Sequence, residues 1–102
     1  SLGPTVTKFE RIWADRIGVK HAVACSSGTA GLHCCLHALG IGPGDEVITS
    51  SFSFVASANV ILYTGATPVF AEVDPLTFNM APAAVEAAIT PRTKAILIAS
   101  VL

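Results

Sequence analysis

Small hydroxylated residues and a glycine are clustered in the segment Ser26-Ser27-Gly28-Thr29. At the start of a helix, the free backbone N–H groups of the first turn favour a bound anion, and Gly28 lets the backbone approach a ligand closely. Thr29 adds a hydroxyl that can donate a further hydrogen bond. A phosphate group fits this pattern. A serine N-cap without any ligand explains the same residues, and both interpretations stay open.

Two aromatic rings lie among serines in a second segment, Ser50-Ser51-Phe52-Ser53-Phe54. Either ring could stack on a flat heteroaromatic ligand, and the alternative is that both belong to the hydrophobic core. Position in the sequence favours the core for Phe52. It leaves the two interpretations of Phe54 open.

His33 and His37 are four residues apart on a predicted helix, a spacing that zinc ligands can have. Cys34 stands where a zinc protease of the H-E-x-x-H type would carry its glutamate, and no third ligand is evident. We therefore expect partly buried histidines and no metal site.

Two further motifs have simple structural explanations. The glycine-rich run 40–44 resembles a dinucleotide-binding fingerprint, but it follows a helix and precedes a strand, which is the reverse of what pyrophosphate binding requires. Asp74 precedes Pro75, and an Asp-Pro turn is a sufficient reason for an aspartate there.

Helices and strands alternate along the chain. Apolar residues at three- to four-residue spacing predict helices, and short continuous apolar runs predict strands. The predicted helices are 4–17, 29–39, 53–64 and 82–89, and the predicted strands are 21–25, 46–49, 68–73 and 94–102. Strands that are apolar throughout are typical of a sheet covered on both faces, and the crossover helices favour a mostly parallel sheet in an α/β fold.

In an open parallel sheet, ligands bind at the carboxyl ends of the strands. Segments 26–29, 50–54 and 74–75 each follow a predicted strand and therefore share that edge. Lys20 and Lys94 enter strands and belong to the opposite edge. The candidate anion site and the candidate stacking ring are thus expected on one edge of the sheet.

Residues for covalent or triad chemistry are missing from that edge. The third lysine, Lys8, lies in the first predicted helix, so no lysine is well placed to form a Schiff base. His21 lies across the sheet, while His33 and His37 lie well down a helix, which makes a Ser/His/Asp arrangement hard to build.

Composition limits the class of protein. The 102 residues are 52% apolar and 13% charged, with a net charge of −1. This excludes a disordered tail and gives no electrostatic reason to expect nucleic acid or an anionic membrane as partner. Because a free-standing domain usually carries about 25% charged residues, we expect a piece whose faces are covered by something else.

The stretches 21–44 and 47–71 lack charged residues, but serines, threonines, glycines and prolines interrupt both, so neither predicts a membrane span. Residues 1–20 carry charges in a helical pattern and do not resemble a signal peptide. The three cysteines are odd in number, which predicts no disulfide framework and favours a reducing cytoplasm.

Several co-linear motifs resemble the DegT-type (StrS-like) nucleotide-sugar aminotransferases, which use pyridoxal 5'-phosphate (PLP). The first two are Cys25-Ser26-Ser27-Gly28-Thr29-Ala30-Gly31-Leu32-His33 and Ala38-Leu39-Gly40-Ile41-Gly42-Pro43-Gly44-Asp45-Glu46-Val47-Ile48. Segments 53–59, 65–70 and 90–96 continue the resemblance in order, and residues 2–4 and 9–10 are similar to its N-terminal segment.

The resemblance implies a three-layer α/β sandwich of the aspartate-aminotransferase-like fold (fold type I). Residues 1–102 would be part of its PLP-binding large domain, truncated at both ends and inactive alone, because the lysine that carries the cofactor would lie outside them. The full-length protein would be a cytoplasmic homodimer. It would transfer an amino group from an amino acid, usually glutamate, to a keto nucleotide-sugar.

By the same resemblance, Ser27, Gly28 and Thr29 bind the cofactor's phosphate and Phe54 stacks on its pyridine ring. No catalytic residue is implied within the chain, no metal is expected, and Cys25 is expected in the core. Three alternatives stay open. They are a PLP-dependent sugar dehydratase of the same family, in which histidine replaces the lysine, a non-catalytic phosphate- or nucleotide-binding α/β module, and a structural remnant without a ligand.

Overall fold

The computed structural model describes residues 3–101, so the predictions that concern Leu2 and Leu102 lie outside the described residues. The helices are α1 (Pro4–Ile17), α2 (Gly28–Ala38), α3 (Ala56–Tyr63) and α4 (Pro82–Ala88), and the strands are β1 (Glu46–Ser50), β2 (Thr67–Ala71) and β3 (Thr93–Leu97). In the described part of the chain, no helix is long and apolar enough to cross a membrane.

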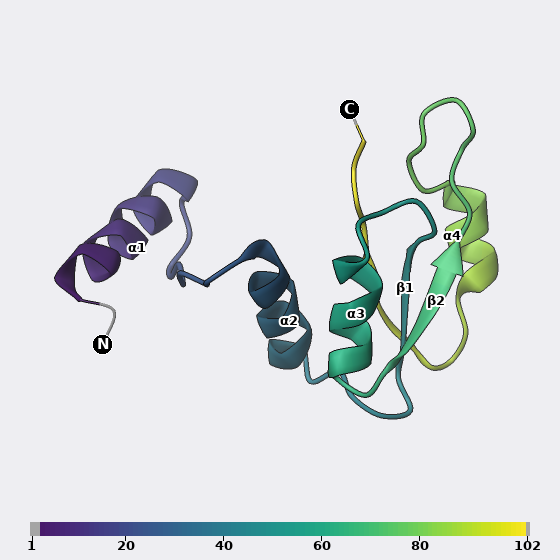
Figure 1. The fold of residues 1–102 in the computed structure, drawn as a ribbon, viewed down its shortest axis with the longest axis horizontal. Helices are drawn as coiled ribbons and strands as arrows, with labels where there is room; N and C mark the ends of the chain where they lie inside the picture. The colour runs from purple at the N-terminus through teal and green to yellow at the C-terminus, as the bar shows by residue number, and fades with distance from the viewer. Residues whose placement is uncertain (1–2, 102) are drawn as a thin grey trace.

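The three strands form one parallel sheet in the order β2-β1-β3. In Figure 1, α2 and α3 lie on one side of the sheet and α4 lies on the other. Four of the five residues of the central strand β1 are buried, as expected for a strand covered on both faces. The predicted α/β class with a parallel sheet is confirmed.

The core lies between β1 and the helices α2 and α3. Val47, Val60 and Ile61 have no exposed surface. They form one cluster with the further buried apolar residues Leu36, Ile41 and Ala66. This cluster fixes α2 and α3 against the sheet, and therefore fixes where the N-terminus of each helix lies.

Helix α1 stands apart from this body (Figure 1). It ends as predicted at Gly18, whose φ of 78° lies in the left-handed region that glycine adopts without strain. The extended segment 19–27 connects it to α2, and the N–H of Ala24 donates to the Glu10 carboxylate at 2.7 Å.

The strand predicted at 21–25 is wrong, because these residues have no regular secondary structure. A strand requires a neighbour that accepts and donates its backbone hydrogen bonds. In residues 3–101 the sheet consists of β1, β2 and β3 alone, and one N–H of the predicted strand pairs instead with the Glu10 side chain.

Two predicted boundaries differ from the structure by three residues or more. Helix α3 begins at Ala56 rather than Ser53, because the chain first makes a turn in which the N–H of Ser57 donates to the Phe54 carbonyl at 3.0 Å. Strand β3 ends at Leu97 rather than Leu102, because its pairing with β1 ends there, with Thr49 opposite Leu97.

Candidate functional site

The carboxyl ends of β1, β2 and β3 and the N-termini of α2 and α3 lie at the same end of the molecule (Figure 1). Segments 50–54 and 74–75 follow β1 and β2, as the sequence predicted. Segment 26–29 has no strand before it. It lies at the same end of the molecule because α2 packs beside α3 and both helices begin there.

Ser27 is the N-cap of α2. Its hydroxyl oxygen accepts a hydrogen bond from the Ala30 N–H at 3.1 Å, and its carbonyl accepts the first helical bond, from Gly31, at 3.0 Å. The N–H groups of Gly28 and Thr29 have no hydrogen-bond partner within residues 3–101. The cap is therefore confirmed, and it leaves two donors at the positive end of the helix for an anion.

Replacing Ser27 by alanine is expected to lower the free energy of unfolding by about 1 kcal/mol, because the Ala30 N–H loses its acceptor. Equilibrium unfolding in urea measures this loss. Ser26→Ala is the matched control, because Ser26 is exposed and its hydroxyl makes no hydrogen bond in the described part of the chain. Equal losses in both variants would contradict the assignment of the cap.

The space in front of Gly28 is open. Apart from its chain neighbours and the backbone of its own helix, a Cβ atom at Gly28 would meet no atom of the described chain within 4 Å. Gly28 lines a cleft of about 590 Å³ together with Val23, Cys25, Gly31, Leu32, Cys34, Cys35 and Ala38. Two free N–H groups, the Thr29 hydroxyl and this open approach are a donor set that fits a phosphate group.

Phe54 is 77% exposed, so its ring is free to stack on a ligand. Phe52 is 53% exposed, and the prediction that it belongs to the core is wrong. Phe52 lies in the loop after β1 and packs against another loop residue, Phe78, with ring centroids 5.4 Å apart.

Phe54 lines a cleft of about 490 Å³ with Ser51, Phe52, Ser53, Ala99, Ser100 and Val101. Gly28 lines a different cleft, so the candidate phosphate and ring sites share an end of the molecule but not a cavity.

Sequence reasoning missed the contribution of residues 99–101 to the Phe54 cleft, because it placed them inside a long final strand. The rule that loops after parallel strands meet at one edge could have found them.

The remaining candidates have structural roles. His33 is half-buried and its ring lies 5.5 Å from that of Tyr63, whereas His37, expected to be partly buried, is exposed in the last turn of α2. Within residues 3–101 there is no group of three or more His, Cys, Asp or Glu side chains that could hold a metal ion.

Asp74 forms the turn that its sequence predicted. One oxygen of its carboxylate accepts hydrogen bonds from the N–H groups of Leu76 and Thr77, at 2.8 and 3.0 Å. Because this local pattern satisfies the carboxylate oxygen, the aspartate is explained without a ligand.

Cys25 is exposed, so the prediction that it belongs to the core is wrong. The cause is the missing strand, since residues 21–25 run as an extended connection outside the sheet. Partial desolvation by its surroundings, followed by the nearby Cys34 thiol, raises the pKa of the Cys25 thiol.

Comparison with known proteins identifies the family. Residues 1–102 match the profile of the DegT/DnrJ/EryC1/StrS aminotransferase family. The chain belongs to this family. Over 97 residues it is 57% identical to the GDP-perosamine synthase of Caulobacter vibrioides, a match that covers 95% of the chain and 26% of that protein. It is 51% identical to the UDP-2-acetamido-2-deoxy-3-oxo-D-glucuronate aminotransferase of Pseudomonas aeruginosa, over 94% of the chain and 27% of that protein.

Solved structures share the fold. The S. venezuelae protein DesV, determined with a ketimine intermediate, superposes with a TM-score of 0.88 at 45% identity, over 95% of the chain and 26% of DesV. The Bacillus subtilis protein NtdA, determined with bound cofactor PMP, superposes with a TM-score of 0.89 at 40% identity, over 96% of the chain and 22% of NtdA. The chain thus has part of the fold type I α/β architecture of PLP-dependent aminotransferases, and spans about a quarter of the length of these relatives.

Proposed function

We propose that residues 1–102 are part of the PLP-binding large domain of an aminotransferase that acts on a keto nucleotide-sugar, with glutamate as the amino donor. The observation that carries the proposal is the start of α2, where the N–H groups of Gly28 and Thr29 stay free although Ser27 caps the helix. The names of the relatives support the substrate class, because both curated proteins described above carry nucleotide-sugar names.

In this proposal each of the four residues has a separate task. Gly28 and Thr29 donate their N–H groups to the phosphate, and the Thr29 hydroxyl donates a third hydrogen bond. Ser27 holds the first turn of α2 in place through its bond to Ala30, and its own O–H stays available to the phosphate. Phe54 presents an exposed ring for stacking on the pyridine.

When bound, PLP supplies the electron sink for amino transfer, and the protein supplies binding, orientation and electrostatics. The chain contributes binding and orientation. None of its three lysines belongs to the segments at the binding end, 26–29, 50–54 and 74–75: Lys8 is in α1, Lys20 is in the connection to α2, and Lys94 is in β3. We therefore expect residues 1–102 alone to show no transamination when PLP is added.

The protein expressed from its whole gene tests the proposal. We expect it to bind PLP and to convert a keto nucleotide-sugar into an amino nucleotide-sugar with consumption of glutamate, detected by mass spectrometry of the sugar product. Loss of water from the sugar without amination would identify the dehydratase alternative instead. Absence of PLP binding would favour a phosphate- or nucleotide-binding module without catalysis.

Replacing Phe54 by leucine is expected to weaken PLP binding about 2- to 10-fold, because an aromatic pair contributes about 0.5–1.5 kcal/mol beyond burial. Titration of the apoprotein with PLP measures the affinity. Phe52→Leu is the comparison, because the Phe52 ring packs on Phe78 and its replacement should weaken PLP binding less than Phe54→Leu. A larger loss in Phe52→Leu than in Phe54→Leu would overturn the assignment of the stacking ring.

The partners and location follow from the same proposal. The full-length protein is expected to be a cytoplasmic homodimer. Size-exclusion chromatography with light scattering tests the dimer, and a monomer at enzymatically active concentration would contradict it. The gene sequence beyond residue 102 gives an independent check, since the proposal requires a further strand that ends in an aspartate for the cofactor, followed by a serine-rich loop with a lysine.

A further inference from the structure

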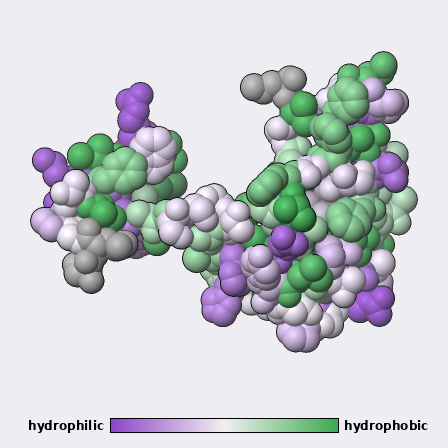
Figure 2. Space-filling view, in the orientation of Figure 1, coloured by the Kyte–Doolittle hydropathy of each residue, from purple (hydrophilic) through white to green (hydrophobic). Residues whose placement is uncertain are grey.

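The Phe54 cleft has two walls that come from different parts of the chain. Phe52 belongs to the loop after β1, and residues 99–101 follow β3. Figure 2 shows hydrophobic side chains on α1 as well as over the main body, so apolar surface does not distinguish this cleft. It is distinguished by a loop that contacts both walls. All partners in these contacts belong to the described chain, so we expect the contacts in the full-length protein as well.

Loop 72–81 joins β2 to α4 and folds back on itself. Val73 and Met80 form an antiparallel bridge, and inside this bridge the N–H of Asp74 donates to the Asn79 carbonyl at 2.8 Å. The turn formed by the Asp74 carboxylate lies between these paired positions. The backbone pairs fix the position of Asn79 relative to the end of β2.

Phe78 connects loop 72–81 to the first wall. Its ring lies 5.4 Å from the Phe52 ring, measured between the centroids. Phe78 has a φ of 58°, a left-handed conformation that residues with a Cβ seldom adopt. Such a conformation persists where neighbouring contacts hold it. The contact with Phe52 is one of these, and the hydrogen bond from the Phe78 N–H to the Asp74 carbonyl, at 2.8 Å, is another.

Asn79 connects loop 72–81 to the second wall through its side-chain amide. The amide oxygen Oδ1 accepts a hydrogen bond from the Val101 N–H at 2.7 Å, and the amide nitrogen Nδ2 donates to the Val101 carbonyl at 3.1 Å. Nδ2 also donates to the Thr77 carbonyl at 3.4 Å. Because a backbone N–H only donates and a carbonyl only accepts, this pairing fixes the orientation of the amide. One side chain thus satisfies both backbone groups of Val101.

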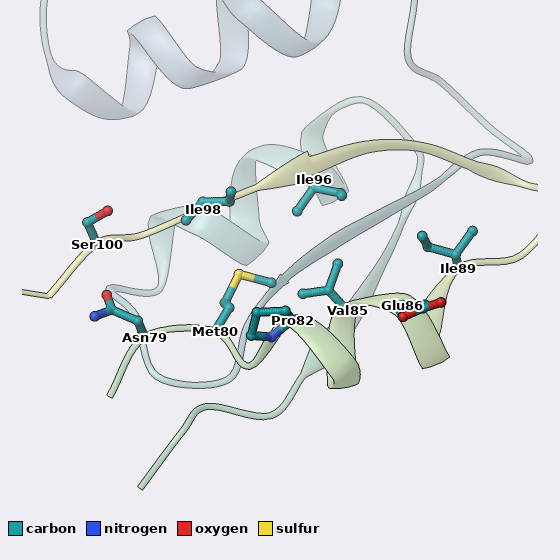
Figure 3. Close-up of a pocket in the computed structure, with 9 residues that line it drawn as sticks. All are labelled: Asn79, Met80, Pro82, Val85, Glu86, Ile89, Ile96, Ile98 and Ser100. Carbon is teal, nitrogen blue, oxygen red and sulfur yellow. The ribbon is translucent and has the colours of Figure 1, made fainter. Parts of the chain in front are cut away.

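Residues 99–101 make no other hydrogen bond within the described chain. The pairing of β3 with β1 ends at Leu97, so no strand of the described chain holds the residues after it. In Figure 3, Asn79 lies at the same end of the pocket between α4 and β3 as Ser100. The position of this wall therefore depends on Asn79.

The strand order makes this a connection between distant parts of the sheet. Strands β2 and β3 lie on opposite sides of β1. Loop 72–81 leaves β2, contacts Phe52 after β1 and reaches residues 99–101 after β3. It therefore joins the two walls of the Phe54 cleft across the carboxyl end of the central strand.

We propose that Asn79 is a positioning residue for the pyridine ring of the cofactor: by holding residues 99–101 in place, it sets the width of the cleft that Phe54 lines. The inference rests on the proposed function for the identity of the ligand. A wall that is ordered before binding removes an entropy cost from the binding step, so loss of the amide should weaken binding of the ring. Gly28 lines a different cleft, so phosphate binding should be unaffected.

Two variants of the full-length protein separate the hydrogen bonds from the space that the side chain fills. Asn79→Ala removes both bonds to Val101. Asn79→Asp keeps the shape, but it places a carboxylate oxygen, which cannot donate, opposite the Val101 and Thr77 carbonyl oxygens. Ile61→Val is the control for a general loss of stability, because Ile61 belongs to the core cluster and does not line the Phe54 cleft.

Hydrogen exchange of the apoprotein tests the bonds between Asn79 and Val101 without any ligand. The Val101 amide is expected to exchange about 2- to 10-fold faster in Asn79→Ala than in the unaltered protein, the range that loss of one hydrogen bond implies. Mass spectrometry with fragmentation that resolves single amides measures the rates.

Titration of each apoprotein with PLP, with pyridoxal, which lacks the phosphate, and with inorganic phosphate tests the positioning role. We expect both Asn79 variants to bind PLP and pyridoxal about 2- to 10-fold more weakly, by the same factor, and to bind inorganic phosphate as tightly as the unaltered protein does. Ile61→Val should leave all three affinities unchanged. A role in stability alone would not separate pyridoxal from phosphate.

Each contrary result has its own meaning. Equal exchange of the Val101 amide in the unaltered protein and in Asn79→Ala would contradict the hydrogen bonds. Faster exchange with unchanged PLP and pyridoxal affinities, or an equal loss of phosphate affinity, would overturn the positioning role. Full PLP affinity in Asn79→Asp would show that the side chain only fills space.

Failure of the proposed function gives a different result. The unaltered protein would then bind neither PLP nor pyridoxal, which would overturn the positioning role as well, while the exchange rates would still report on the hydrogen bonds. Circular dichroism checks that each variant is folded, and Asn79→Asp decides the question if Asn79→Ala does not fold.

Discussion

Replacing Ile61 by alanine is expected to lower the free energy of unfolding by about 2–5 kcal/mol. Ile61 has no exposed surface and belongs to the cluster that joins α3 to the sheet. Its truncation removes buried apolar area and leaves a cavity that the surrounding core fills only in part. Equilibrium unfolding in urea, followed by circular dichroism, measures the change as a lower transition midpoint.

Leu62→Ala is the matched control for this prediction. Leu62 is the next residue in α3, loses the same number of carbon atoms, and is 56% exposed. Its replacement is expected to cost less than about 1 kcal/mol. A loss in Leu62→Ala as large as in Ile61→Ala would contradict the orientation of α3 described above.

Replacing Gly28 by proline is expected to weaken PLP binding about 10- to 100-fold relative to Gly28→Ala, because a hydrogen bond to a charged group contributes about 1.5–3 kcal/mol. Proline lacks the N–H that we assign to the phosphate, whereas alanine keeps it. The fold should accept proline. Gly28 is the first residue of α2, a position that favours proline, and Ser27 before it is extended with φ −161° and ψ 165°.

Both variants place a Cβ in the open space at Gly28. Comparing them therefore separates the effect of losing the N–H on PLP affinity from the effect of the added Cβ. Titration of the full-length apoprotein with PLP and with pyridoxal, which lacks the phosphate, measures both affinities. The proline variant should lose affinity for PLP and keep its affinity for pyridoxal and its melting temperature. Equal PLP affinities of Gly28→Pro and Gly28→Ala would show that this N–H does not bind the phosphate.

Much of the fold could be predicted from local sequence signals. Gly18 ends α1 as expected, and Pro82 begins α4. The run at 46–49 became the central strand β1, which is buried because helices lie on both sides of the sheet. These features depend on residues close in sequence or on burial, which composition and periodicity report directly.

The errors concern features that depend on partners far away in the sequence. The run 21–25 has the composition of a buried strand, but pairing decides whether a strand forms, and no strand within residues 3–101 pairs with it. The same missing strand explains why Cys25 is exposed. Phe52 illustrates the second cause of error, since its contact with Phe78 joins two loops that no periodicity connects.

For the candidate site, the sequence indicated the types of residue and the edge of the sheet, and the structure added which donors are free. The Ser27 cap and the phosphate interpretation looked like alternatives in the sequence. In the structure they are compatible, because the cap uses only the Ala30 N–H and leaves those of Gly28 and Thr29 without a partner in the described chain.

The strand order β2-β1-β3 has a consequence for synthesis on the ribosome. The middle strand, β1, is synthesised first. Its second partner, β3, cannot pair with it until the ribosome has translated Thr93, the residue opposite Glu46. At about 5–20 residues per second this delay lasts a few seconds, during which one edge of β1 is unpaired. During this interval the backbone N–H and C=O groups along that edge of β1 are unpaired and can pair with another chain. We therefore expect a chaperone to bind β1 during translation.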